Sequence, residues 1–483
     1  MKNIVNFYES LERDSISRHN AYEAFALPGL ATEALTIASQ SLIKSVSKFE
    51  AMKISVSGIR GVFGKDLMLR DILKFSKNFS VLINSKKCVI ATDTRPSGHM
   101  ITETVKAGLM QSGIDVYDLG IAPTPVAFRE SRKYGAGIIV TSSHNPIEWN
   151  GLKMVIDGKG INEKQLDTII NEQNPSKSKI GVEYKIESDY IDDAAKIIGK
   201  ISDIPKVSVD IGGGAAKKFA SQLLEKVGCD VITINSDFEK CSRGPDPTTE
   251  TLQELVVNTK NRDIGFAFDL DGDRLVIVIN GEKKNPDVTL GIGVVKALEL
   301  GYKNFVLSQD TSISIEKYIK QKGGTVFRSK VGEANVTEKM IETKSQVGGE
   351  GSSGGFIFSD FNYCRDGILT SGLIASIIKK DEFADVLNFM EKYHIIRDKV
   401  EYDSEHHDDI LKALHDKMKE KFGSVETLDG LKAIIDEDSW ALVRKSNTEN
   451  AIRVSAESNS LEKVRNIHQE IKDLVKESYE QIK

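Results

Sequence analysis

The feature that most constrains the fold is a repeated alternation of short strands and helices. From Met52 to residue 399, apolar runs rich in β-branched residues are each followed by a polar loop and a stretch of helical character. Strands that alternate with helices in this way form parallel βαβ sheets. The alternation restarts three times at similar spacing, which predicts an α/β fold with three related domains and mixed, largely parallel sheets. The predicted strands are residues 87–92, 114–119, 136–140, 206–210, 264–268, 304–308 and 325–328.

The two ends of the chain depart from this alternation. Residues 1–51 fit one or two amphipathic helices, broken at Pro28-Gly29, and we expect them to form an N-terminal helical extension. Near the other end, strand-like residues 440–444 and 451–455 flank a polar loop and precede a helical stretch, which predicts a smaller α+β domain. A chain of 483 residues is too long for one core. The predicted domains are 1–51, 52–190, 191–290, 291–399 and 400–483.

Composition excludes several classes of protein. The formal net charge is −6 and no basic run stands out, so we expect no nucleic-acid partner. The four cysteines are scattered without a CxxC pair, which argues against a disulfide framework or a structural zinc site and fits a reducing cytoplasm. No apolar run reaches the ~18 residues of a membrane span, and no secretory signal opens the chain. We therefore expect a cytoplasmic protein without a membrane partner.

A polar cluster, Thr141 to Pro146, follows the predicted strand 136–140 directly. It crowds a hydroxyl nucleophile, a histidine and an asparagine amide onto one turn, and Lys153 lies ten residues beyond Ser143. Ligands of open α/β sheets bind at the carboxyl ends of the strands. An ordinary turn is the plainer interpretation, because Ser, Asn and Pro are turn formers. Three further loops of unusual composition favour a catalytic role for this cluster over an ordinary turn.

The second loop places carboxylates at every other position, Asp269, Asp271 and Asp273, after a wholly apolar strand. Three such groups repel one another unless a cation lies between them. Oxygen ligands without nitrogen or sulfur favour Mg²⁺. A calcium EF-hand does not fit, because the sixth position is Arg274 and the twelfth is Asn280. A solvated acidic turn is the alternative.

The third loop, residues 348–355, contains five glycines around Glu350, Ser352 and Ser353. Glycine lets backbone amides approach a ligand closely, and a carboxylate that accepts two hydroxyls suits the vicinal diol of a sugar. The loop also contains G-x-S-x-G, a pattern of hydrolases that requires a helix after the serine. A β-like run follows instead, so a sugar-binding loop or a flexible turn remain as interpretations.

The fourth loop, residues 444–450, gathers Arg444, Ser446, Asn447 and Thr448 between two strands, and Arg453 follows. Cations combined with hydroxyl and backbone donors make a phosphate-binding set. An ordinary surface turn is the alternative.

Two weaker signals complete the inventory. Residues 57–61 predict a tight glycine loop from which Arg60 could reach a phosphate, although a surface arginine is the plainer interpretation. The glycines at 212–214 suggest a dinucleotide fold, but the third glycine of GxGxxG would fall at Lys217, so the fingerprint is incomplete.

A serine, a carboxylate triplet, a polyhydroxyl-reading loop and a phosphate-binding loop together indicate phosphoryl transfer on a phosphorylated sugar. The four loops, in this order, resemble those of the α-D-phosphohexomutases, the family of phosphoglucomutase, phosphomannomutase and phosphoglucosamine mutase. The resemblance extends from about Met52 to the C-terminus. It implies three related α/β domains and a smaller C-terminal domain around a central cleft. It also implies an Mg²⁺-dependent isomerase that interconverts hexose 1-phosphates and 6-phosphates through a phosphoserine and a hexose 1,6-bisphosphate.

The resemblance further implies roles for single residues. Ser143 matches the phosphoryl carrier, and Lys153 is a candidate general acid or base. The remaining residues implied near the reacting phosphate are Arg60, His144 and Arg274. The implied metal ligands are Ser143, through its phosphoryl group, Asp269, Asp271 and Asp273. The implied substrate-binding residues are Glu350, Ser352, Ser353, Arg444, Ser446, Asn447, Thr448 and Arg453.

The chain departs from the family pattern at the sugar-reading and phosphate-binding loops. The sugar loop has one extra residue, so Ser352 and Ser353 both match the motif serine, and it lacks the histidine that many members carry after the last glycine. The phosphate-binding loop ends in Glu449-Asn450 where Glu-Pro is usual. We favour phosphoglucosamine mutase, with phosphomannomutase/phosphoglucomutase as the alternative. A non-catalytic sugar-phosphate-binding homologue fits less well, because the serine, the aspartates and the lysine are all intact. An Mg²⁺-dependent phosphatase fits less well, because the separate phosphate-binding loop suits a substrate that is held at both ends.

Overall fold

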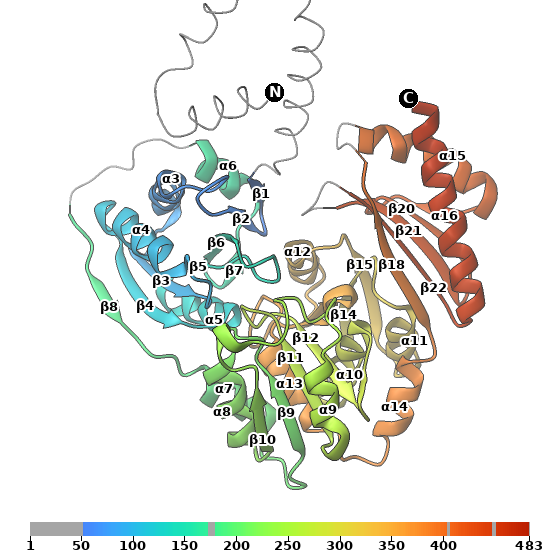
Figure 1. Ribbon diagram of the computed structural model, residues 1–483, viewed down its shortest axis with the longest axis horizontal. Coiled ribbons are helices and arrows are strands. Elements are labelled where there is room, and N and C mark those ends of the chain that lie inside the picture. The colour runs from blue at the N-terminus through green and yellow to red at the C-terminus, as the bar shows by residue number, and fades with distance from the viewer. Residues whose placement is uncertain (1–51, 172–178, 403–405, 447–450, 483) are drawn as a thin grey trace, which may run out of the picture. The chain divides into compact units, whose positions relative to one another are not determined.

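The computed structural model describes residues 52–171, 179–402, 406–446 and 451–482. The predicted N-terminal extension and the loop residues Asn447 and Thr448 lie outside these ranges. Across the described ranges, three sheets with parallel strands are followed by one antiparallel sheet, with helices between the strands (Figure 1). The predicted fold class is confirmed. None of the helices in these ranges combines the length and apolarity that a bilayer span requires.

The first sheet is formed by the chain between Lys53 and Lys185. In chain order the elements are β1 (Lys53–Ser55), β2 (Gly58–Val62), α3 (Leu69–Phe79), β3 (Lys87–Thr92), α4 (Gly98–Gln111), β4 (Asp115–Ile121), α5 (Thr124–Tyr134), β5 (Ala136–Val140), β6 (Trp149–Ile156), β7 (Lys159–Gly160), α6 (Glu163–Asn171) and β8 (Glu183–Lys185). The strand order is β1-β2-β6-β5-β3-β4-β8, and β7 pairs with β6. Strand β5 is parallel to β3 but antiparallel to β6.

The second sheet follows the same plan. Its elements are α7 (Tyr190–Ile198), β9 (Lys206–Asp210), α8 (Lys217–Val227), β10 (Asp230–Ile234), α9 (Gln253–Asn258), β11 (Ile264–Phe268), β12 (Leu275–Ile279) and β13 (Glu282–Lys283). The order is β10-β9-β11-β12-β13, in which β11 is parallel to β9 and antiparallel to β12.

The third sheet repeats the plan once more. Its elements are α10 (Pro286–Glu299), β14 (Asn304–Ser308), α11 (Ile313–Gln321), β15 (Thr325–Ser329), α12 (Glu333–Thr343), β16 (Val347–Glu350), β17 (Gly355–Phe358), α13 (Gly367–Ala375) and α14 (Phe383–Met390). The order is β15-β14-β16-β17, with β16 parallel to β14 and antiparallel to β17. In all three sheets a parallel strand therefore passes through one loop into an antiparallel neighbour. The serine, aspartate and glycine loops occupy this equivalent position.

The C-terminal sheet is different in kind, because every strand pair in it is antiparallel. Its elements are β18 (His394–Val400), α15 (His407–Phe422), β19 (Val425–Glu426), β20 (Leu431–Asp436), β21 (Ser439–Lys445), β22 (Ile452–Ser458) and α16 (Leu461–Ile482). The strand order is β18-β22-β21-β20-β19. The predicted domain limits stay predictions, and we note that β18 lies in this sheet although it precedes residue 400.

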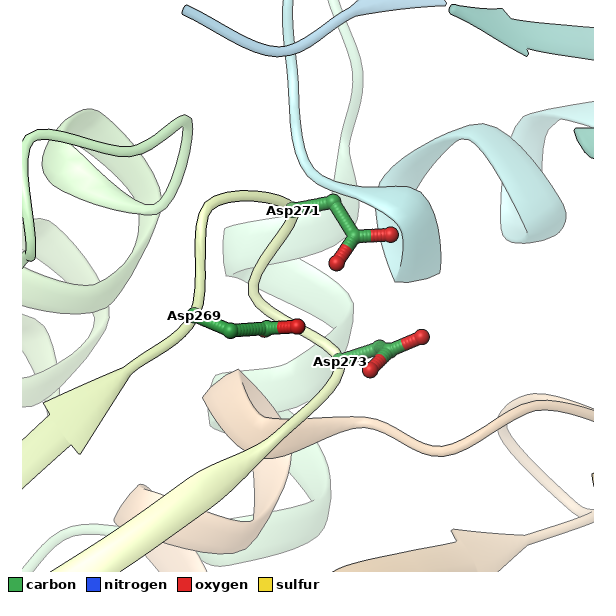
Figure 2. A group of neighbouring side chains, drawn as sticks. All are labelled: Asp269, Asp271 and Asp273. Atoms are coloured by element: carbon green, nitrogen blue, oxygen red, sulfur yellow. The ribbon is translucent and has the colours of Figure 1, made fainter. Parts of the chain in front are cut away.

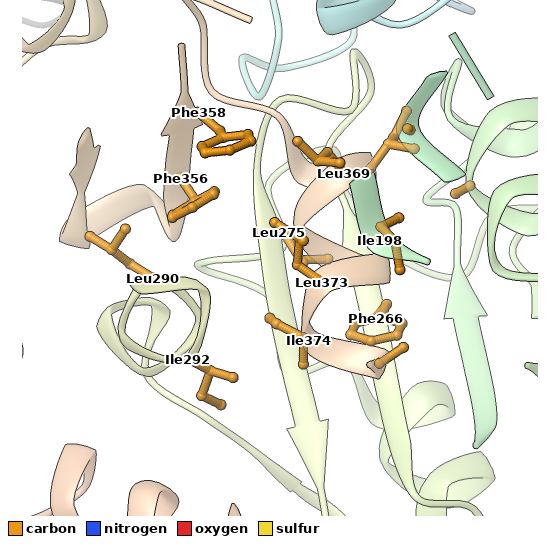
Figure 3. Packing of buried hydrophobic residues seen from close by; sticks show 14 of the residues in the cluster. Ile198, Phe266, Leu275, Leu290, Ile292, Phe356, Phe358, Leu369, Leu373 and Ile374 are labelled. Atoms are coloured by element: carbon orange, nitrogen blue, oxygen red, sulfur yellow. The ribbon is translucent and has the colours of Figure 1, made fainter. Parts of the chain in front are cut away.

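The largest hydrophobic cluster joins the first three domains. Helix α13 is buried along its whole length, as expected for a helix that is apolar on all sides. Its residues Leu369, Leu373 and Ile374 lie in one cluster with Phe266 and Leu275 of the second sheet (Figure 3). The C-terminal domain has a separate cluster around α15, α16 and its own sheet. The serine, aspartate and glycine loops thus rest on a shared core, and the fourth loop rests on another.

The structure corrects the prediction for residues 57–61. The glycines predict a tight loop, but Gly58–Val62 form strand β2, which pairs with both β1 and β6. Ile59 is buried in the core, so strand pairing and burial outweigh the preference of glycine for turns. Arg60 is consequently held on a strand, opposite Gly151 of β6.

Candidate active site

The loop that carries Ser143 is fixed by hydrogen bonds to its own backbone. Ser143 adopts a left-handed conformation with φ of 49°, which is unusual for a residue other than glycine. Thr141 Oγ1 accepts a hydrogen bond from the Ser143 amide at 2.8 Å and donates to Asp93 Oδ2 at 2.6 Å. Such strain persists only where the surroundings impose it, and it clusters at functional sites.

Arg95 supplies most of that constraint, and the sequence analysis assigned it no role. Its guanidinium is fully buried, and Asp93 Oδ2 accepts its Nε at 3.1 Å. Its other nitrogens donate to four backbone carbonyls of the serine loop and the start of β6, those of Ser143, Asn145, Pro146 and Trp149. The buried ion pair of Arg95 and Asp93 therefore holds the backbone of the serine loop in its conformation. The only sequence signal was a polar Asp-Thr-Arg run at the end of a predicted strand.

The three aspartates converge as predicted. Asp269, Asp271 and Asp273 are completely buried, and one oxygen from each lies within 4.8 Å of the other two. Figure 2 shows the three carboxylates turned to the same side of the loop between β11 and β12. Ser143 Oγ donates to Asp269 Oδ2 at 2.7 Å, which places the serine against this cluster.

The cluster has the properties of a cation site. Burial, and then the charges of Asp271 and Asp273, raise the pKa of Asp269 well above its usual value. The Oδ1 atoms of Asp271 and Asp273 are buried and have no hydrogen-bond donor within the described ranges. Buried carboxylate oxygens without donors are costly unless a cation binds them. An all-oxygen set of this kind could hold a hard divalent metal.

Lys153 lies on β6 beside the same carboxylates. Its Nζ donates to Asp273 Oδ2 at 2.8 Å and lies 3.4 Å from Asp271 Oδ2. Burial alone would lower the pKa of Lys153, but the charges of Asp273 and Asp271 outweigh burial and raise it above its usual value. Lys153 therefore donates to these carboxylates as an ammonium, and it remains the candidate general acid or base.

His144 bridges the serine and a second cation. Its Nδ1 lies 3.3 Å from Ser143 Oγ, and its Nε2 lies 3.2 Å from Nη2 of Arg274. Burial and the charges of Arg274 and Arg60 lower the pKa of His144 well below its usual value, so the ring is neutral. Because a guanidinium only donates, Nε2 must accept and the ring proton must lie on Nδ1. His144 therefore donates to Ser143 Oγ and does not accept its proton.

The two predicted arginines, Arg60 and Arg274, lie near Ser143 and His144. Arg274 also pairs with Asp246, at 3.2 Å, and Arg60 Nη1 donates to Asn145 Oδ1 at 3.1 Å. Burial lowers the pKa of Arg60 from its usual value. Both side chains line the cleft, so they present positive charge where a phosphoryl group on Ser143 would lie.

The sugar-reading loop is tied to the cleft by Glu350, the last residue of β16. Its Oε1 accepts the amide of Gly332 at 2.7 Å, and its Oε2 accepts Nη1 of Arg365 at 2.9 Å. Ser353 is buried and donates to the carbonyl of Glu350 at 3.3 Å, whereas Ser352 is partly exposed. Both serines line the cleft.

The phosphate-binding residues of the C-terminal sheet form a pair of cations. Arg444 on β21 and Arg453 on β22 are direct register partners, and Ser446 follows β21. Partners on neighbouring antiparallel strands place their side chains on the same face. Both arginines line the cleft, so this face presents positive charge that suits a phosphate. The other two predicted members, Asn447 and Thr448, lie outside the described residues.

One cleft of about 1120 Å³ joins these groups. Predicted site residues from all four domains line it, namely Arg60, His144, Lys153, Arg274, Glu350, Ser352, Ser353, Arg444, Ser446 and Arg453. Ser143 and the three aspartates are buried behind this lining. Charged residues that the sequence analysis did not predict also line it, among them Glu333, Arg365, Arg397 and Lys399.

Comparison with known proteins identifies the family. Profiles described as phosphoglucomutase/phosphomannomutase match the chain as alpha/beta/alpha domain I at residues 51–179, domain II at 188–282, domain III at 285–393 and the C-terminal domain at 399–474. The chain belongs to the phosphoglucomutase/phosphomannomutase family. Members of this family are phosphomutases, so the predicted class, an isomerase that moves a phosphoryl group within a hexose phosphate, is confirmed.

Individual family members align over nearly their full length. A probable phosphoglucosamine mutase of Methanosphaera stadtmanae is 35% identical, over 88% of this chain and 98% of the relative. A phosphoglucomutase/phosphomannomutase of Thermococcus kodakarensis is 32% identical, over 84% and 95%. The solved structure of a family protein from Burkholderia thailandensis superposes with a TM-score of 0.78 at 26% identity, covering 88% of this chain and 98% of that one.

Proposed function

We propose that this phosphohexomutase interconverts glucosamine 6-phosphate and glucosamine 1-phosphate through phosphorylated Ser143 and a hexose 1,6-bisphosphate. The observation that carries the proposal is the contact of Ser143 Oγ with the aspartate cluster, in a cleft whose C-terminal side presents paired arginines. The choice of an amino sugar is supported by the name of the Methanosphaera relative and by the sugar loop, which lacks the family histidine.

The cation would be Mg²⁺, held by Asp269, Asp271, Asp273 and the phosphoryl group on Ser143. When bound, it would offset negative charge on the phosphoryl oxygens during transfer. The orphaned Oδ1 atoms of Asp271 and Asp273 support this assignment.

The protein side chains would position the reacting groups. The bond between Ser143 Oγ and phosphorus breaks as the phosphoryl group bonds to the free hydroxyl of the sugar phosphate. That hydroxyl loses its proton and Ser143 Oγ gains one, with Lys153 as the candidate acid or base that would carry it. Lys153, Arg60 and Arg274 would donate hydrogen bonds to the phosphoryl oxygens, and His144 would donate to Oγ as its bond to phosphorus breaks. Such preorganised donors supply most of the catalysis in phosphoryl transfer.

The other end of the cleft would hold the substrate. Glu350, with Ser352 or Ser353, would accept the sugar hydroxyls, while Arg444, Ser446, Asn447, Thr448 and Arg453 would bind the distal phosphate. After the first transfer the bisphosphate must turn around, so that its second phosphate can return to Ser143. A hydrolase has no need for a second phosphate site, and this argues against the phosphatase alternative.

The test follows three sugars in parallel. The protein is incubated with Mg²⁺ and a trace of hexose 1,6-bisphosphate, and glucosamine 1-phosphate, glucose 1-phosphate and mannose 1-phosphate are each converted separately. We expect 6-phosphate products, with the highest kcat/KM for glucosamine 1-phosphate. Higher values for mannose or glucose would favour phosphomannomutase/phosphoglucomutase, as the Thermococcus relative is named. Inorganic phosphate without any 6-phosphate product would overturn the mutase proposal.

A further inference from the structure

Arg365 holds together three carboxylates from three separate loops. It lies between β17 and α13, its side chain is 11% exposed, and it lines the cleft. Nη1 donates to Glu350 Oε2 and Nη2 to Asp273 Oδ2, both at 2.9 Å, and Nε lies 3.3 Å from Glu333 Oε2. One guanidinium therefore connects the sugar loop, the aspartate loop and the first residue of α12.

Gly355 provides the space that Arg365 occupies. A Cβ atom built on Gly355 would lie 2.2 Å from Cδ and 2.7 Å from Cγ of Arg365, distances that real Cβ contacts do not reach. Gly355 opens strand β17 and does not have a positive φ, so its backbone is open to any residue. Space, and not backbone conformation, therefore requires glycine here.

The contacts fix how Glu350 faces the cleft. One of its oxygens is held by the Gly332 amide and the other by Arg365, yet each carboxylate oxygen accepts more than one hydrogen bond. Glu350 can thus still accept sugar hydroxyls while both of its oxygens stay in place. A lysine is not equivalent to Arg365, because its ammonium is a point charge and lacks the planar fork that holds Glu350, Asp273 and Glu333 in fixed directions.

We propose that Arg365 is a positioning residue for sugar recognition, which orients Glu350 and links it to Asp273 from the space that Gly355 leaves open. The inference rests on the proposed function, since it assumes that Glu350 binds the sugar. The two positions, 355 and 365, act as one unit.

The first test separates sugar binding from chemistry. Arg365→Met and Arg365→Lys are compared with Arg132→Met, because Arg132 donates to the carbonyls of Phe361 and Ser359 and supports the same loop from outside the cleft. We expect both Arg365 variants to raise KM at least about tenfold and Arg132→Met to leave KM within about twofold. A KM within twofold for both Arg365 variants would overturn the proposal.

The second measurement needs no metal and no turnover. Each variant is placed in a Ser143→Ala background, and binding of glucosamine 6-phosphate is measured by calorimetry in the presence of a chelator. Arg365→Met should weaken binding about tenfold or more. Unchanged binding would count against the proposal. Absence of mutase activity in the unaltered protein would instead contradict the proposed function, because this binding measurement does not depend on activity.

A double-mutant cycle tests the shared space. Gly355→Ala leaves Arg365 chemically intact but displaces its stem, so it should raise KM strongly alone. In an Arg365→Ala background the stem is gone and only Ser353 Oγ, 2.9 Å from the added Cβ, must shift, so the same substitution should change KM much less than it does alone. If Gly355→Ala is equally harmful in both backgrounds, the two positions do not act as one unit and the proposal fails. Thermal unfolding of each variant identifies any that do not fold. If Arg365→Ala or Gly355→Ala does not fold, the KM of Arg365→Lys still tests the proposal.

Discussion

The two ends of the cleft are built in different ways. At the serine end, the reacting groups are buried, bonded to one another and supported by a hydrophobic cluster that runs through the first three domains. At the phosphate-binding end, Arg444 and Arg453 are partly exposed and belong to a sheet with its own core. The serine end is therefore rigid before substrate arrives, whereas the other end belongs to a separately packed unit.

Polar contacts join that unit to the third domain. Arg397 of β18 donates to Asp287 at 2.7 Å, Glu457 of β22 accepts the Ile313 amide at 2.8 Å, and Lys432 of β20 donates to the carbonyl of Gln309 at 2.8 Å. Polar interfaces between domains permit relative motion more readily than large apolar ones. The comparison shows that the groups around Ser143, where bonds form and break, are held in fixed positions. The C-terminal domain, which would bind the distal phosphate, is joined to the rest by polar contacts and can adjust its position.

Ser143→Ala tests the serine end most severely. Without Oγ no phosphoenzyme forms, and we expect the mutase rate to fall by at least about 10³-fold, as for removal of other catalytic nucleophiles. Rates are measured with added hexose 1,6-bisphosphate, and intact mass reports phosphate on the protein. Thr94→Ala, a nearby hydroxyl with no role assigned above, serves as control. Phosphate on the Ser143→Ala protein would contradict the assignment of the carrier.

Arg95→Met tests whether the rigidity of that end matters. The change leaves Asp93 buried without its cation and frees the serine loop from four carbonyl contacts. We expect a loss of about 3–5 kcal/mol in stability and a fall in kcat of about 10²-fold with little change in KM. Thermal unfolding and steady-state kinetics measure the two effects. The Asp93→Asn/Arg95→Met double variant should be more stable than Arg95→Met alone. Unchanged kcat would show that loop geometry is not limiting.

Arg444→Ala tests the opposite end. Loss of a charge-assisted contact to the distal phosphate should raise KM by about 10- to 100-fold. We expect kcat to change by less than about threefold, because the groups at Ser143 are untouched. Lys463→Met, which removes an ion pair with Asp436 on the surface of the same domain, provides the control. A large fall in kcat with an unchanged KM in Arg444→Ala would contradict the view that the two ends of the cleft have separate roles.

Lys432→Met tests the contact between the C-terminal domain and the third domain. The quantity measured is the stability of the protein as a function of pH. Burial and the charge of Arg328 lower the pKa of Lys432 to about 7, although Glu426, Glu457 and Glu316 oppose the shift. In the unfolded chain the lysine pKa is about 10.4. Between these values the unfolded state binds more protons, so this group makes the protein more stable as pH rises from about 7 to about 10.

The expected size of this pH effect is about 1–3 kcal/mol between pH 6 and pH 9, the smallest of the four. Thermal midpoints of the unaltered protein and of Lys432→Met are compared at both values of pH. The increase in stability from pH 6 to pH 9 should be larger in the unaltered protein than in Lys432→Met by that amount. Equal increases in both proteins would mean that Lys432 is charged at this contact throughout this range.

The fold and the four main loops were predictable because their signals are local. Strands β3, β5, β9, β11 and β14 coincide with the predicted apolar runs, since a buried parallel strand is apolar on both faces. The aspartate loop was identified because its own composition demands a cation. Arg60 was misplaced in a loop because glycine content was weighed above strand pairing.

Arg95 and Arg365 were missed because their partners lie far away in the chain. Arg95 contacts carbonyls about fifty residues later, and Arg365 contacts Asp273, 92 residues earlier. Each is a single arginine in a polar loop, which resembles many surface arginines until the sheets are assembled. No local pattern distinguishes a buried arginine whose partners are backbone carbonyls or distant carboxylates.

The position of Ser143 in a hairpin has an electrostatic consequence. Many phosphate sites receive part of their positive potential from a helix N-terminus, but the serine loop runs from β5 into the antiparallel β6 and begins no helix. The positive potential at Ser143 therefore comes from side chains anchored in the protein and from the cation proposed at the aspartate cluster. When the phosphoryl group leaves for the sugar, about two negative charges leave the serine, and the charge balance around Ser143 becomes more positive. The bisphosphate, which carries two phosphate groups, is then attracted back to the site it has just left, so the electrostatic field retains it until it has turned.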